Sequence, residues 1–369
     1  MIIRSKAPLR IGLAGGGTDL ETYSNVYGGC VLNAAIEMYA YCTIIPTNDG
    51  KIKIYSYDNK NNIEMDSVPE INLDGNKLIL HRGVYNRIVK QFNGGKPLSF
   101  IMSTSNDAPV GSGLGTSSTM VVAILEAFNK WLGLGLDDYE MAQLAYEIER
   151  KDLALAGGKQ DQYAAVFGGF NFMEFKPDKS VIVNPLALNR QRINELQCSL
   201  LLYYSGKSHD SAQMQLELTK NIIKEQNANN EKKVGTAIDA MHNIKQTAYK
   251  MKDYVLTGNN EAFAQALRDG WENKKKTSSI VSNVELEKTI NFALAHGAEA
   301  VKVSGAGGGG FLMLYCNPIN RQKLINEMNT LGGKIYSVNF SKKGVESWKV
   351  DQKTNKNADD DDEEQAMHL

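Results

Sequence analysis

The residues best placed to do chemistry lie in one glycine-rich stretch, 109–118, which leads directly into an apolar helix pattern over 119–134. Glycines leave backbone N–H groups free to close around an anion. Hydroxyl side chains follow at the first helical turn, where unpaired N–H donors and the helix dipole favour negative charge. The pattern predicts a phosphate-binding loop with oxygen donors for a metal ion. Its residues are Pro109, Gly111, Ser112, Gly113, Leu114, Gly115, Thr116, Ser117 and Ser118.

This loop differs from two commoner phosphate-binding loops. A Walker loop requires a lysine before the Ser or Thr, whereas Gly115 precedes Thr116 here. A dinucleotide fingerprint requires glycine at its sixth position, and counted from Gly111 that position is Thr116. A simpler interpretation stays open, in which the glycines only turn the chain into a helix whose first turn holds Ser and Thr.

A second glycine-rich segment, 304–310, lies between apolar strand patterns over 301–303 and 311–315. Its glycines match the dinucleotide spacing, but a strand pattern follows where that motif requires a helix. The segment is therefore either a tight hairpin or a strand–loop–strand whose backbone approaches another loop closely.

Composition narrows the classes of function. The 369 residues suffice for about two domains, and 42% hydrophobic with 22% charged residues is typical of a globular protein. A net charge of −1 with scattered basic residues predicts neither nucleic acid nor membrane as a partner. No apolar run approaches the roughly 20 residues that cross a bilayer. The widely spaced His and Cys residues predict no zinc site or disulfide, and a cytoplasmic location is expected.

The spacing of apolar residues predicts the strands and helices that position these loops. Two-residue alternation over 51–57 and apolar runs over 170–175 and 199–204 predict strands, and 81–92 predicts a short helix. Asp137 and Glu140 form a capping-box pattern before another helix. Long helices are expected over 212–276 and 284–295. The mixture predicts an α+β fold with domains at 1–185 and 186–350 and an acidic disordered tail at 351–369.

A third segment that stands out in the sequence is 7–19, which contains three consecutive glycines followed by Thr18 and Asp19. With the loops at 109–118 and 304–310, in this order and spacing, it resembles the three signature motifs of the galactokinase–homoserine kinase–mevalonate kinase–phosphomevalonate kinase (GHMP kinase) superfamily, over residues 1 to about 345. The resemblance implies a two-domain GHMP kinase fold, with an N-terminal domain like domain 2 of ribosomal protein S5, a ferredoxin-like C-terminal domain and the active site between them.

The resemblance also implies roles for individual residues. The 109–118 loop would bind the phosphates of ATP, and Ser117 and Glu149 would hold Mg²⁺. Asp161 would face the acceptor hydroxyl, with Arg10 neutralising charge beside it. Phosphoryl transfer needs such a cradle, a divalent metal and a residue that orients the nucleophile. Substrate-binding residues would be Arg10, Gly16, Gly17, Thr18, Asp19, Lys159, Asp161, Gly307 and Gly308.

Within the superfamily the motifs look like the branch that holds heptose 7-phosphate kinases and L-fucose kinases. That branch implies Mg²⁺- and ATP-dependent phosphorylation of an anomeric hydroxyl, here D-glycero-α-D-manno-heptose 7-phosphate to its 1,7-bisphosphate, ahead of GDP-heptose synthesis for surface polysaccharide. The alternatives are a kinase for a free sugar such as L-fucose and an inactive sensor that binds sugar and ATP. Candidate cations for a sugar phosphate are Lys159, Lys207, Lys274 and Lys275. The exact sugar and the oligomeric state stay open.

Overall fold

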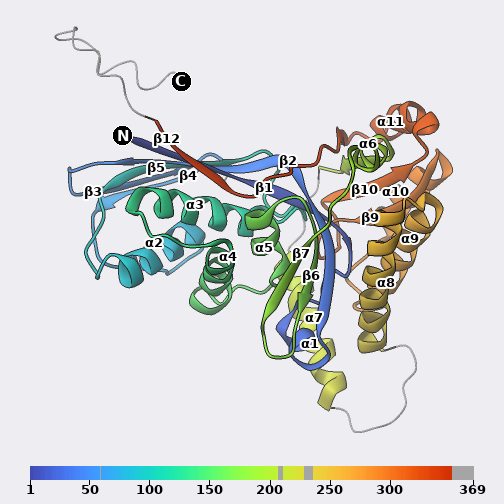
Figure 1. The fold of residues 1–369 in the computed structure, drawn as a ribbon, viewed down its shortest axis with the longest axis horizontal. Helices are drawn as coiled ribbons and strands as arrows, with labels where there is room; N and C mark the ends of the chain where they lie inside the picture. Colours follow the sequence, from blue (N-terminus) through green and yellow to red (C-terminus); the bar gives the residue numbers. More distant parts are fainter. Residues whose placement is uncertain (59, 207–210, 228–235, 351–369) are drawn as a thin grey trace.

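The structure is a computed structural model that describes residues 1–58, 60–206, 211–227 and 236–350. An eight-stranded sheet with helices on one face forms one half, and a four-stranded sheet with further helices forms the other (Figure 1). The α+β expectation is confirmed. The acidic tail at 351–369 and Lys207 lie outside the described residues.

The large sheet has the strand order β12-β1-β2-β5-β3-β4, and β6 and β7 extend it from the far part of β2. The long central strands β1 and β2 are antiparallel, and they carry apolar side chains on both faces because both faces are covered. The bounds of the strands are β1 Ile2–Ala14, β2 Gly29–Pro46, β3 Lys51–Ser56, β4 Asn61–Asp66, β5 Phe100–Asn106, β6 Phe170–Phe175, β7 Val181–Pro185 and β12 Glu346–Val350.

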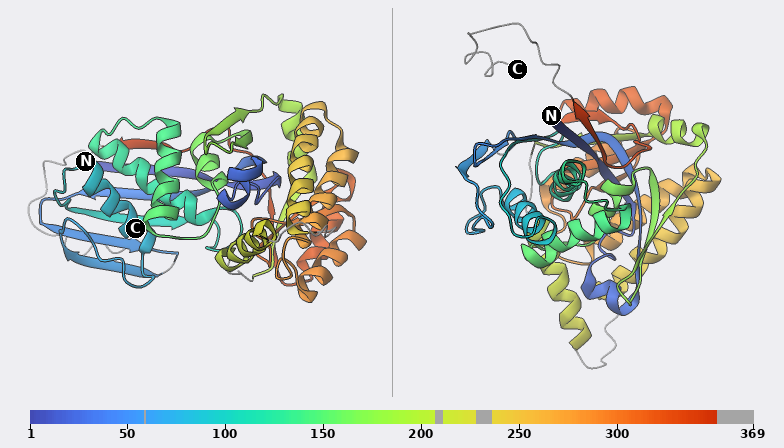
Figure 2. Two further views of the ribbon diagram at one scale, coloured as in Figure 1. Left: turned by 90° about the horizontal axis from the view of Figure 1, so that it is seen from below. Right: turned by 60° about the vertical axis from the view of Figure 1, so that its left-hand side comes forward.

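Helices α2 to α5 cover one face of this sheet, as the two further views also show (Figure 2). The central helix α3 is buried along most of its length, which explains why its sequence is apolar almost all round. The capping box predicted at Asp137 and Glu140 begins α4. The bounds are α1 Glu21–Tyr27, α2 Ile79–Phe92, α3 Thr116–Leu132, α4 Asp138–Glu147, the π-helix η1 Ile148–Asp152 and α5 Gln160–Phe167.

The second half is built on the sheet β11-β8-β10-β9. Side chains of β8 alternate between its two faces: Leu200 and Leu202 pack toward β1, β2 and α8, while Leu201 and Tyr203 pack toward α10 and α11. One apolar cluster therefore joins the two halves. The bounds are α6 Arg190–Ser199, β8 Leu200–Tyr204, α7 Ser211–Asn227, α8 Ala237–Thr257, α9 Asn260–Lys275, α10 Val284–Ala295, β9 Ala298–Val303, β10 Phe311–Cys316, η2 Pro318–Asn320, α11 Arg321–Asn329 and β11 Lys334–Ser337.

The end of the described chain differs from the expected division of the sequence. The segment 186–350 was expected to form the C-terminal domain throughout. Instead its last strand, β12, pairs antiparallel with β1, from Ile2 opposite Val350 to Lys6 opposite Glu346. Without β12, the backbone groups at the edge of β1 would lack hydrogen-bond partners, and the returning strand supplies them. The local pattern of apolar and polar residues does not reveal such a long-range pairing. The two halves are thus linked by the chain twice.

Candidate active site

A cavity of about 370 Å³ lies between the two halves. The loop 109–118 and the start of α3 form one wall, η1 and α5 a second, and α7, the end of α9 and the loop 304–310 a third. Arg10, Ser117, Glu149 and Asp161, which the family resemblance places in catalysis or at Mg²⁺, all line it. Its polar lining includes Arg10, Asp19, Ser117, Glu149, Arg150, Asp161 and Lys274.

The two glycine-rich loops contact each other directly at this cavity. Gly113 has φ +85°, and a Cβ at this position would lie 2.4 Å from the carbonyl oxygen of Ser304. The backbone N–H of Phe311 donates to the Ser112 carbonyl at 3.0 Å. The prediction that the 304–310 backbone approaches another loop closely is confirmed, and the hairpin alternative alone does not explain it. Glycine is needed because two backbones meet where a side chain would stand.

Helix α3 begins at Thr116 without a side-chain cap, because its N-cap residue is Gly115. The donors of its first turn therefore face the cavity side of the loop without competition from a capping oxygen. The Thr116 and Ser118 side chains are buried, whereas Ser117 is partly exposed and lines the cavity. The interpretation of 109–118 as a simple capped turn loses support, since the helix lacks the cap that it requires.

Glu149 is delivered by the π-helical turn η1, which follows α4. Its carboxylate is 1% exposed and accepts a hydrogen bond of 3.1 Å from the Ser118 hydroxyl and another from Gln162 Nε2. Arg150 Nη1 lies 3.8 Å away, a long ion pair. π-turns often mark functional positions. Here the turn directs both Glu149 and Arg150 toward the cavity.

Arg10 and Asp161 form the central ion pair of the cavity. Arg10 Nε and Nη2 both approach Asp161 Oδ1, at 2.7 and 2.6 Å, while Arg10 Nη1 donates to the Gly113 carbonyl at 2.6 Å. Register with β2 shifts between Pro8 and Arg10, and such an irregularity re-aims a side chain. Asp161 stands on the first turn of α5, where the helix dipole favours a carboxylate. The pair ties the motif of β1 to the glycine loop.

Asp19 is positioned by the first motif in a different way. Its carboxylate accepts the backbone N–H groups of Gly17 at 3.0 Å and Gln160 at 3.1 Å. It is 3% exposed, and a Cβ on Gly158 would collide with it. One carboxylate therefore holds together the 15–19 turn and the 157–160 segment, which directly precedes Asp161.

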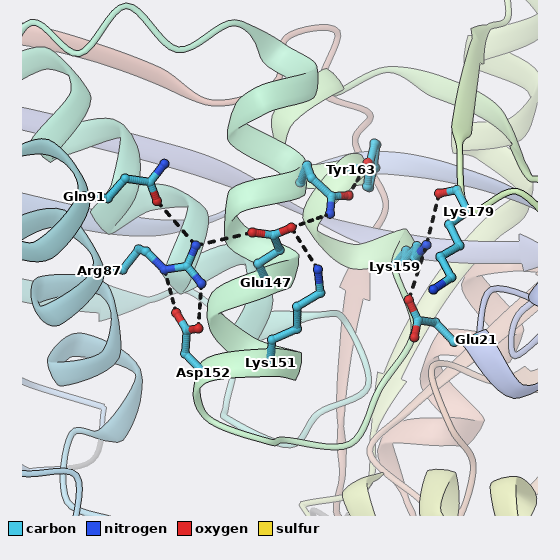
Figure 3. Close-up of polar contacts among 10 residues, drawn as sticks. Glu21, Arg87, Gln91, Glu147, Lys151, Asp152, Lys159, Tyr163 and Lys179 are labelled. Carbon is cyan, nitrogen blue, oxygen red and sulfur yellow. Dashed lines mark hydrogen bonds and ion pairs between the residues drawn. The ribbon is translucent and has the colours of Figure 1, made fainter.

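Five of the residues expected to bind substrate lie away from the lining of the large cavity. The Thr18 hydroxyl donates to the carbonyls of Gly15 and Cys30 and is fully buried, so it holds a turn together. Lys159 lies 3.6 Å from Glu21 and donates to the Lys179 carbonyl (Figure 3). The loop glycines Gly307 and Gly308 pack against Val281. Gly16 borders a second, smaller cavity of about 20 Å³ behind the first.

Several site residues were not predicted from the sequence. Arg150 donates to the carbonyls of Leu155, Ala156 and Gly158 and so supports the loop before Asp161. Gln162 contacts both Glu149 and Ser118 and is fully buried. The only sequence signal for Gln162 is its place next to Asp161. The neighbouring surface of η1 is held by Arg87, which pairs with Asp152 and Glu147 (Figure 3).

Lys302 is a buried lysine that joins the halves. Its ammonium donates to the carbonyls of Gly12 at 2.7 Å and Leu13 at 3.1 Å. Burial and, to a smaller extent, the nearby positive charges of Lys274 and Arg10 together lower its pKa to about 7.

This pKa predicts a pH dependence of stability. The folded state releases the Lys302 proton near pH 7, whereas the unfolded chain keeps it up to about 10.5. Between these values the unfolded state binds more protons, so stability rises with pH. We expect the free energy of unfolding of the wild type, relative to Lys302→Met, to increase between pH 7 and 10 in urea titrations. Exchange of the exposed Lys90 for Met is the control, and an equal slope in all three proteins would contradict the prediction.

Comparisons with known proteins agree with this arrangement. The family description "GHMP kinases N terminal domain" matches residues 79–169, and "GHMP kinases C terminal" matches 251–334. The D-glycero-alpha-D-manno-heptose 7-phosphate kinase of Campylobacter jejuni is 45% identical over 348 residues, covering 94% of this chain and 99% of that protein. The L-fucokinase/L-fucose-1-P guanylyltransferase of Bacteroides fragilis is 26% identical over 85% of this chain but 34% of its own length.

Among solved structures, a D-glycero-D-manno-heptose 1-phosphate kinase from Bacteroides thetaiotaomicron superposes with a TM-score of 0.79 at 45% identity, covering 95% of this chain and 100% of the other. These likenesses define the class of protein, a two-domain phosphotransferase. The chain belongs to the GHMP kinase family, whose members use ATP. No helix in the described parts of the chain is long and apolar enough to span a membrane.

Proposed function

We propose that this protein transfers the γ-phosphoryl group of ATP to the anomeric hydroxyl of D-glycero-α-D-manno-heptose 7-phosphate, giving the 1,7-bisphosphate. The observation that carries the proposal is the Arg10–Asp161 ion pair at the meeting point of the two glycine loops. A carboxylate able to receive a proton there stands beside a loop built to hold phosphate. The relative named as a heptose 7-phosphate kinase, 45% identical over nearly both chains, supports the choice of acceptor.

The residues present suit an in-line transfer. Asp161 accepts or polarises the proton of the anomeric hydroxyl, whose oxygen forms a bond to the γ-phosphorus while the bond from that phosphorus to the β–γ bridging oxygen breaks. Arg10 pairs with Asp161 through two of its nitrogens and fixes the orientation of the carboxylate. The backbone N–H groups of the 109–118 loop and the α3 terminus receive the phosphate charges. Asp19, held by two backbone N–H groups, is placed to accept a sugar hydroxyl.

The donor set also fits Mg²⁺. Glu149 is a buried carboxylate whose partners are neutral groups and one long ion pair, and Ser117 presents a hydroxyl to the same cavity. The described residues contain no group of three or more His, Cys, Asp or Glu side chains suited to a metal. Mg²⁺ typically takes one or two protein ligands and completes its shell with water and substrate phosphates. When bound, it would neutralise charge on the nucleotide phosphates.

This assignment predicts the effect of Glu149→Gln. The amide keeps the shape of the carboxylate and removes its charge, so we expect the Mg²⁺ concentration for half-maximal activity to rise about 10- to 100-fold. Mg²⁺ titration at fixed ATP measures it. Exchange of Glu147 for Gln, two residues earlier and paired with Arg87 and Lys151, is the control. If both variants showed the same dependence of activity on Mg²⁺ concentration, Glu149 would not be a metal ligand.

The position of the new phosphate tests the proposed reaction. Purified protein with Mg²⁺ and ATP is offered heptose 7-phosphate, heptose 1-phosphate, free heptose and L-fucose, with ADP release as the readout. Product ³¹P NMR should then show a second phosphate coupled to the anomeric proton, and only for the 7-phosphate at low substrate concentration. A product formed from the 1-phosphate acceptor, as the name of one similar structure suggests for that protein, would overturn the choice of hydroxyl. ADP production with L-fucose alone would favour the free-sugar alternative, and no turnover would favour the sensor.

A further inference from the structure

Lys274, on the last turn of α9, is a buried cation at the cavity. It is 8% exposed, and its ammonium donates to the Gly305 carbonyl at 2.9 Å. Within the part of the chain that the structure describes, no other hydrogen bond and no ion pair engages this ammonium. A buried ammonium with unused donors is costly. Because Lys274 lines both the large cavity and the smaller one behind it, an anion in the cavity would remove that cost.

The neighbours of Lys274 indicate which anion this is. Gly305, which accepts its hydrogen bond, packs directly on Gly113, and the Gly113 carbonyl accepts from Arg10. Asp161 already has Arg10 as its cation, and Asp19 is held by backbone N–H groups. Lys274 is therefore the ammonium left available where the nucleotide loop and the proton acceptor meet, and that is where the transferred group passes.

We propose that Lys274 is a catalytic residue that donates hydrogen bonds to the non-bridging oxygens of the phosphoryl group during its transfer. This inference rests on the proposed kinase reaction and adds to it a cation supplied by the C-terminal half. Arg10 orients the proton acceptor from one side, while Lys274 contacts the phosphoryl group from the other. The ammonium keeps its own protons throughout, because it stabilises charge without transferring a proton.

The charge of Lys274 responds to pH in a range that can be measured. Burial lowers its pKa to about 8; Asp19 and Asp161 oppose this and Arg10 adds to it. Lys302, behind it on β9, is a further titratable neighbour, and it loses its proton at a lower pH than Lys274. We expect kcat of the wild type to fall above about pH 8 as the ammonium is lost. Lys274→Arg keeps a charge at that pH, so its basic limb should move up by at least one pH unit.

Substitution separates this role from binding of the acceptor's own phosphate. We expect Lys274→Met to lower kcat about 10²- to 10³-fold with heptose 7-phosphate and, to the same extent, with unphosphorylated heptose, while the acceptor KM changes only a few-fold. The exposed Lys276→Met, two residues along, is the matched control. A loss confined to KM for the phosphorylated sugar would assign Lys274 to the acceptor phosphate and overturn the proposal, as would an unchanged kcat.

A binding measurement gives a readout apart from turnover. ADP with aluminium fluoride and acceptor imitates the transferring group, and Lys274→Met should weaken this complex at least 10-fold while binding ADP alone normally. Equal loss of both complexes would indicate a structural role. Should Lys274→Met fail to fold, the kcat–pH profile of Lys274→Arg tests the proposal instead, and a basic limb at the wild-type position would overturn it. Turnover with another sugar in the wild type would revise the proposed acceptor and leave this inference standing, whereas a wild type without kinase activity would overturn both.

Discussion

Asp161→Asn should lower kcat by about 10²- to 10⁴-fold at saturating ATP and sugar phosphate, the loss typical when a general base is removed. The amide keeps the size of the side chain but cannot take the proton of the acceptor hydroxyl. KM for ATP should stay within a few-fold, because the Gly113 carbonyl still holds Arg10 on the loop. Coupled ADP-release kinetics measure both constants. Because an anomeric hydroxyl is more acidic than an ordinary alcohol, we expect the decrease in kcat to lie near the lower end of this range.

A matched carboxylate provides the control for that experiment. Asp66 also pairs with a basic residue, Lys51, at 2.8 Å, but on the β3–β4 hairpin and largely exposed. Asp66→Asn should leave kcat unchanged. Because Arg10 is 4% exposed, removal of its partner also destabilises the fold, so unfolding midpoints are needed to show that the assayed protein is native. Near-normal turnover by a folded Asp161→Asn variant would show that this residue is not the proton acceptor.

Gly113→Ala should abolish productive nucleotide binding. The added methyl would sit 2.4 Å from the Ser304 carbonyl oxygen at φ +85°, so the two glycine loops must separate. Misplacement of the order of 1 Å at reacting groups can cost about 10²-fold in rate, and here the loop itself, the Arg10 contact and the Gly305 contact all move. We expect kcat/KM for ATP to fall at least 10²-fold, measured together with ADP affinity by calorimetry.

Gly133 is a control that separates backbone strain from the close contact between the two glycine loops. It directly follows α3, has φ +65°, and nothing lies within 4 Å of a Cβ built there. Gly133→Ala should therefore cost only about 1–2 kcal/mol of stability, the price of a left-handed conformation, with ATP kinetics unchanged. If Gly113→Ala behaved like Gly133→Ala in both assays, contact between the two loops would not matter for function.

Local sequence signals anticipated most of the elements, because they act over one turn or one strand. The helix over 81–92, the capping box at Asp137 and the strands over 170–175 and 199–204 are confirmed as α2, α4, β6 and β8. The elements near the expected domain boundary were predicted less well. The segment around the expected domain boundary at residues 185 and 186 contains β7 and the start of α6, which were not predicted because such short elements carry little apolar periodicity.

The chain's own residue types and spacing predicted the phosphate-binding loop and the strand–loop–strand at 304–310, because glycine freedom and first-turn chemistry are local properties. Asp161 was indicated by the family resemblance. Only the tertiary structure decided which charges meet. Arg10 and Asp161 are 151 positions apart, Lys274 and Gly305 are 31 apart, and β12 returns to β1. It also turned Thr18 and Lys159 away from the cavity, brought Arg150 to its lining and placed Gln162 behind Glu149 and Ser118. Burial and packing across the two halves choose such partners, and no short stretch of sequence encodes them.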